Sequence, residues 1–148
     1  MNTTWILVAN QVEARIYSSK RIPGNLLLLD TLTHDEGAAH PRDLVSDAPG
    51  RAYDSSGSGR HAMEPVTGVK EEGRRKFVKE MVDLLESARQ KDRFDQLVFL
   101  AAPAVLGVIR KTLSDGLARI VVKEIPKDVI GQGMDKIQDQ LQRAFELK

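Results

Sequence analysis

Two short, wholly apolar segments constrain the fold of this chain more than any other feature. Trp5–Ala9 (WILVA) and Leu97–Ala101 (LVFLA) contain no charged or amide side chain. Unbroken apolar runs of this length predict strands that are covered on both faces, as in a parallel sheet packed between helices. The sequence therefore predicts an α/β fold.

Short connections join three predicted strands near the amino terminus. After Trp5–Ala9, the segment Ala14–Tyr17 alternates small or apolar residues with polar ones, and Leu26–Leu32 (LLLLDTL) is again apolar. Asn10–Gln11 and the Pro-Gly turn of Arg21–Asn25 separate these strands. Connections this short favour an antiparallel meander.

Helical periodicity begins after a long polar segment. Apolar spacing predicts helices at Glu71–Lys91, from Pro103 to an end at Ser114–Asp115–Gly116, and at Met134–Phe145; Ile120–Ile125 predicts a fifth strand. The resulting element order is β-β-β-α-β-α-β-α. It predicts a single mixed sheet, a three-stranded antiparallel meander plus two parallel strands, covered by helices, as in release-factor-core or ribonuclease-H-like domains.

Length and composition predict one domain over residues 1–148, with a long polar loop at about residues 34–70. The 22 basic and 21 acidic residues nearly balance, so a nucleic-acid role would need a local basic patch. The absence of cysteine excludes disulfides and thiolate catalysis. The amino terminus lacks a basic region and a long apolar run, which predicts a cytoplasmic protein with no membrane segment.

Several chemistries lack the residues that they need. A two-metal nuclease needs clustered carboxylates, but Trp5–Ala9 holds no acid and the fourth strand ends in Ala101–Ala102. His34, His40 and His61 do not have metal-ligand spacing. Dinucleotide-binding, P-loop and nucleophile-elbow patterns are also missing. We therefore predict no metal, no cofactor and no catalytic residue, and a non-catalytic protein is favoured over an enzyme.

The long polar loop holds the candidate binding residues. Asp47–Arg51 predicts a tight turn that presents an arginine, and Gly57–Arg60 predicts a nest of backbone N–H groups beside a guanidinium. Such an arrangement suits phosphate or carboxylate. The alternative is a solvated loop with ordinary surface arginines. The candidate anion-binding or RNA-binding residues are Arg42, Arg51, Gly57, Gly59, Arg60, His61, Arg74 and Arg75.

Four stretches resemble a known bacterial family. They are WILVANQVEARIY, LVSDAPGRAYDSSGSGRHAMEP, FDQLVFLAAPAVLGVIRKTL and VVKEIPKDV, and SDAPGR followed by SGSGRHAME is the most specific. Together they are similar to the family called "protein required for attachment to host cells", a relative of the central domain of archaeal and eukaryotic peptide-chain release factors. The resemblance implies the mixed α/β fold. In release factors the loop carries Gly-Gly-Gln; Gly57–His61 holds no glutamine, so no catalytic residue carries over.

The resemblance and the loop lead to three functional hypotheses. The first is a non-catalytic, release-factor-like module that binds the ribosome, tRNA or another anionic partner through the Gly-Ser-Arg loop. The second is a hydrolase of peptidyl-tRNA or a related ester, with His61 as general base and Arg60 stabilising an oxyanion. The third is an adhesion factor acting in attachment to host cells, which would have to be exported.

Overall fold

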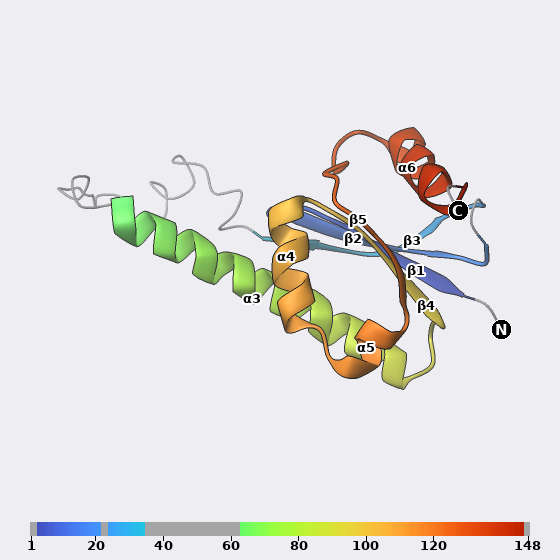
Figure 1. Ribbon diagram of the computed structural model, residues 1–148, viewed down its shortest axis with the longest axis horizontal. Helices are drawn as coiled ribbons and strands as arrows, with labels where there is room; N and C mark the ends of the chain where they lie inside the picture. Colours follow the sequence, from blue (N-terminus) through green and yellow to red (C-terminus); the bar gives the residue numbers. More distant parts are fainter. Residues whose placement is uncertain (1–2, 22–23, 35–62, 147–148) are drawn as a thin grey trace.

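The computed structural model describes residues 3–21, 24–34 and 63–146, without the side chains of 63–70. Its five strands form one sheet in the order β3-β2-β1-β4-β5 (Figure 1). β1 and β2, and β2 and β3, pair antiparallel, whereas β1, β4 and β5 run parallel. The predicted mixed sheet is thus confirmed. The strands are β1 (Thr4–Ala9), β2 (Glu13–Ser19), β3 (Leu27–Thr33), β4 (Gln96–Ala101) and β5 (Val121–Ile125).

Helices cover both faces of the sheet. Three of them lie on one face and α6 lies on the other (Figure 1). α3 begins earlier than Glu71, so the last part of the predicted polar loop is helical, and its first turns extend beyond the sheet (Figure 1). The helices are α3 (Met63–Gln90), α4 (Pro103–Thr112), α5 (Asp115–Arg119) and α6 (Met134–Glu146).

The short helix α5 was not predicted. Ser114–Asp115–Gly116 was interpreted as the end of a helix, but Ser114 is the N-cap of a new one: its Oγ accepts a hydrogen bond from the Leu117 amide at 3.1 Å. Serine is a favoured N-cap because this bond satisfies an otherwise unpaired amide. The added helix buries Leu117 against the sheet.

The strands divide their side chains between two apolar cores, because successive strand residues point to opposite faces. On β1, Leu7 faces α3 and α4, while its neighbours Ile6 and Val8 face α6. All three side chains are fully buried. The expectation that WILVA and LVFLA are covered on both faces is confirmed, since β1 and β4 are buried apart from Gln96.

Candidate anion-binding site at the carboxyl edge of the sheet

Four strands end at one edge of the sheet. β1, β4 and β5 run parallel, and β3 runs in the same direction because each pairing in the meander reverses the chain. We call this side, which the chain reaches at Ala9, Thr33, Ala101 and Ile125, the carboxyl edge. In open α/β sheets ligands bind beyond the carboxyl ends of the parallel strands. The carboxyl edge is therefore where a site is expected.

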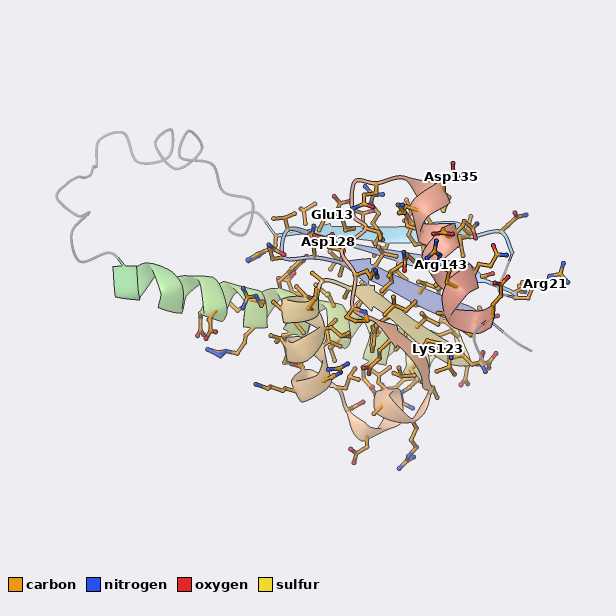
Figure 2. All side chains as sticks on the ribbon, turned by 45° about the horizontal axis from the view of Figure 1, so that its top comes forward. Glu13, Arg21, Lys123, Asp128, Asp135 and Arg143 are labelled. Atoms are coloured by element: carbon orange, nitrogen blue, oxygen red, sulfur yellow. The ribbon has the colours of Figure 1, made fainter. Side chains whose placement is uncertain are left out.

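Asn10 organises this edge. Its Oδ1 accepts hydrogen bonds from the amides of Val12 at 2.8 Å and Glu13 at 3.0 Å, which closes the turn between β1 and β2. Its Nδ2 lies 3.3 Å from each carboxylate oxygen of Asp128, in the segment after β5. Figure 2 shows Glu13 and Asp128 at the same end of the sheet. A single asparagine thus connects two strand ends that are distant in sequence.

His34 connects the end of β3 to α3. Its amide donates to the Val12 carbonyl at 2.9 Å, and its ring stacks on Phe77 with the centroids 4.9 Å apart and the planes at 13°. The sequence placed His34 at the start of the long polar loop, but the structure packs its ring against a helix. Its ring is half-buried because a helix from much later in the chain passes beside the strand end.

Arg74 is a predicted site residue on the part of α3 that packs beside this edge. It lies three residues before Phe77, so the two side chains share one face of α3. The Arg74 side chain is partly buried, and its Nε has no hydrogen-bond acceptor within the described residues. Buried polar groups are normally paired, so an unpaired guanidinium nitrogen is unusual.

Arg75 does not join Arg74. It is exposed, and its guanidinium lies 3.7 Å from the carboxylate of Glu72 on the same helix. Of these two predicted arginines, only Arg74 therefore shares the face of α3 that carries Phe77. The remaining candidates lie outside the described residues, in the segment that follows His34 and precedes Met63: Arg42, Arg51, Gly57, Gly59, Arg60 and His61.

The amino terminus of α4 also lies at this edge. Its N-cap is Ala102, whose amide donates to the Ala9 carbonyl at 3.0 Å, and no described side chain caps the helix. The first turn holds Pro103 and no acidic residue. Unpaired amides and the helix dipole give such a terminus a partial positive charge. Sequence analysis identified the proline but not this property, which depends on where β1 and β4 end.

The carboxylates near the edge already have partners. Glu13 forms an ion pair with Arg15, and Asp128 contacts Asn10 and also accepts from the Ile130 amide at 3.2 Å. Across the described residues, no three His, Asp or Glu side chains are grouped so that they could hold a metal ion. The described part of the edge thus combines paired carboxylates with the partly buried guanidinium of Arg74.

A family model matches residues 5–141, nearly the whole described molecule from β1 into α6. Its description is "Protein required for attachment to host cells". The chain belongs to this family. An uncharacterized protein of Rickettsia prowazekii (strain Madrid E) is 27% identical over 88 residues, which is 58% of this chain and 59% of that relative.

A solved structure of an archaeal protein is also similar to this host-attachment chain. It is 16% identical, with a TM-score of 0.47, and the similarity covers 96% of this chain and 36% of the other. In both comparisons the similarity spans less than two thirds of the other protein. None of the helices in the part of the chain that the structure describes is long and apolar enough to cross a membrane.

Proposed function

We propose that this member of the host-attachment family is a non-catalytic module that binds RNA phosphates, on the ribosome or on tRNA, through basic residues at the carboxyl edge. The proposal includes the release-factor-core type of fold and a cytoplasmic location. The element order and the mixed sheet support the fold type. The Gly-Ser-Arg segment would supply further contacts from its position between β3 and α3.

The observation that carries the proposal is the Nε of Arg74, which has no hydrogen-bond acceptor among the residues that the structure describes. Leaving a buried donor unsatisfied destabilises a protein by roughly 1–3 kcal/mol, and more for a charged group. A phosphate oxygen would satisfy it with a short, charge-assisted hydrogen bond, since the guanidinium fork matches phosphate geometry. The uncapped amino terminus of α4 would add a second favourable interaction for an anion at the same edge.

The test is fluorescence anisotropy of a labelled single-stranded RNA, titrated with the protein across a series of salt concentrations. Binding through phosphates weakens as salt rises, with a logarithmic slope of about −0.7 per contact for single strands. Arg74→Gln removes one cation, so we expect weaker binding and a slope that is shallower by about 0.7. Ribosome co-sedimentation over the same salt series checks the larger partner.

Arg119→Gln is the matched control. Arg119 is an exposed arginine at the end of α5, which leads into the start of β5, so it lies at the end of the sheet opposite the carboxyl edge. The Arg119→Gln variant should bind RNA as tightly as the wild type does. Absence of binding at the lowest salt, or equal losses in the Arg74 and Arg119 variants, would refute the proposed site.

A further inference from the structure

A groove lies where the carboxyl end of α3 passes the start of β1. It holds about 270 Å³ and is lined by Trp5, Leu84, Ser87, Ala88, Lys91 and Arg93. This volume is slightly below the roughly 300–1,000 Å³ of pockets that hold drug-sized molecules. The groove therefore has room for a small ligand only.

The floor of the groove is apolar and held in place by the core. Trp5 and Ala88 are each only 8% exposed, and Leu84 packs against the same apolar cluster. The ring of Trp5 stacks on that of Phe94, with the centroids 4.6 Å apart and the planes at 22°. An aromatic side chain that is already fixed loses little conformational freedom when a second ring packs beside it. The floor thus favours an aromatic or other flat apolar group.

Two cations stand at the rim because of the way α3 ends. Asp92 has a left-handed backbone, with φ at 57°. Its amide donates to the Arg89 carbonyl at 2.9 Å, and the Arg93 amide donates to the Ala88 carbonyl at 3.0 Å. This is the Schellman arrangement, which satisfies the last carbonyls of a helix. The chain turns between Lys91 and Arg93, so both exposed side chains line the groove, whereas Asp92 does not.

The positive charge at this rim is open to an anion. Among the residues that the structure describes, no carboxylate forms an ion pair with Lys91 or Arg93. Asp95, the next acid along the chain, accepts a hydrogen bond from the Thr3 amide at 2.9 Å. The carbonyls at the end of α3 already accept hydrogen bonds from the turn, so the two cations dominate the charge of the rim. A carboxylate or phosphate placed between them would form charge-assisted hydrogen bonds.

We propose that this groove binds a small aromatic anion, with its ring against Trp5 and its charged group between Lys91 and Arg93. The apolar floor and the basic rim are complementary to a molecule whose two ends differ in the same way. The groove is separate from the proposed RNA site. Arg74 and Gln90 are 16 residues apart on α3, or roughly 24 Å along a helix that rises about 1.5 Å per residue. The two sites can therefore be tested independently.

The single tryptophan gives a direct probe of the groove. In a proton–nitrogen correlation spectrum of the full chain, the indole N–H signal of Trp5 is followed while benzoate or phenyl phosphate is added at constant ionic strength. We expect a saturable shift with a Kd on the order of millimolar, since so small a ligand makes few contacts. Benzyl alcohol lacks the charge and acetate lacks the ring, so each should bind at least about tenfold more weakly.

The two anions distinguish the kinds of charged group. Binding of benzoate alone assigns a carboxylate to the rim, binding of phenyl phosphate alone assigns a phosphate ester, and binding of both supports the chemistry that they share. If neither anion gives a saturable shift, or if benzyl alcohol or acetate binds as tightly as they do, the proposal is overturned.

Charge-removing variants locate the bound anion. Lys91→Gln and Arg93→Gln should each weaken binding by about three- to tenfold, because each removes one charge-assisted hydrogen bond. Lys136→Gln is the matched control, since Lys136 is an exposed lysine on α6, which covers the other face of the sheet. Equal affinities of the Lys91 and Lys136 variants would place the anion elsewhere and refute the site.

A variant that fills the groove gives an independent test. Ser87 is exposed on α3 and lines the groove, so Ser87→Phe should place a ring over the floor without disturbing the core. We expect this variant to lose the saturable shift of the Trp5 signal, while circular dichroism shows an unchanged fold. Arg74→Gln should bind the anions as the wild type does. Wild-type affinity in a folded Ser87→Phe would contradict the proposed position of the ligand.

Discussion

The two faces of the sheet are built differently. The face under α3, α4 and α5 has a continuous apolar cluster to which three helices and three strands contribute buried residues. The other face is covered by α6, which buries Ile137 and Leu141 over β1, β4 and β5. Polar contacts also link the helices of the first face, since Glu86 of α3 accepts a hydrogen bond from Ser114 at 2.9 Å. Side chains on both faces are fully buried, so the two faces differ in the number of helices packed against them rather than in burial.

Truncating one leucine on each side should give the largest contrast. Leu85 of α3 and Leu141 of α6 are almost fully buried. We expect Leu85→Ala to lower the free energy of unfolding by about 4 kcal/mol and Leu141→Ala by about 2 kcal/mol. The cavity that the Leu85 truncation leaves would be enclosed by several packed elements, whereas α6 can shift inward to fill the space that the Leu141 truncation leaves.

Urea unfolding measures both costs. The single tryptophan, Trp5, stacks on Phe94 and reports on the α3 side through its fluorescence, while far-ultraviolet circular dichroism follows all helices. If Leu85→Ala and Leu141→Ala lowered the free energy of unfolding equally, the two faces of the sheet would not differ in how they respond to truncation.

A smaller effect should follow from removing the cap that α5 needs. Ser114→Ala deletes both the bond to the Leu117 amide and the bond to Glu86. We expect a loss of about 1–2 kcal/mol, the upper range for an N-cap serine. Ser87→Ala, at an exposed position of α3, should change stability by less than about 0.5 kcal/mol. Thermal unfolding of the two variants compares them directly, and a neutral Ser114→Ala would show that α5 does not depend on its cap.

The smallest expected effect is a pH dependence of stability that comes from Glu86, on the α3 side of the sheet. Hydrogen bonds from Arg89 and then Ser114 lower the pKa of Glu86 from 4.5 to about 2. A carboxyl whose pKa is lower in the folded chain stabilises it above its ordinary pKa, and this contribution is lost as the pH falls toward the folded value. The stability difference between wild type and Glu86→Gln should therefore shrink between about pH 5 and pH 2.

Urea unfolding midpoints of wild type and Glu86→Gln, measured at a series of pH values, would give that difference in stability. Asp139→Asn on α6 is the control, because Asp139 contacts Arg143 at 3.2 Å in an exposed pair. Exposed pairs contribute little, so its difference from wild type should stay small at every pH. A constant difference for Glu86→Gln would contradict the pKa argument.

Local pattern predicted most of the fold because the strands and helices obey their own periodicities. WILVA and LVFLA are buried at the centre of the sheet, and α6 begins at Met134 as its apolar spacing predicted. One prediction was wrong, and one feature was not predicted. Ser114 has the same local chemistry whether it follows one helix or begins another, and the leucines of β3 do not reveal that their strand lies at an edge.

The candidate site was less predictable because its parts come from distant segments. Arg74 was identified as a basic residue, but the lack of an acceptor for its Nε among the described residues depends on the packing of α3 beside the end of β3. The His34–Phe77 stack and the uncapped start of α4 arise in the same way. The pattern of residues within one segment cannot predict these contacts, because each of them joins segments that are distant in the sequence. Whether the segment between His34 and Met63 contributes arginines to this edge stays a prediction.

The pairing of β1 with β4 has a consequence for how the chain assembles. Thr4 lies opposite Gln96, so β1 gains its parallel neighbour only after all of the residues between the two strands have been made. The meander of β1, β2 and β3 closes through local contacts, but β1 keeps one side unpaired until then. Non-local pairing of this kind slows folding, and unpaired apolar strands favour misassembly in the meantime. Thus β1, which is buried along its whole length in the folded molecule, is also the strand that stays unpaired on one side until β4 has been made.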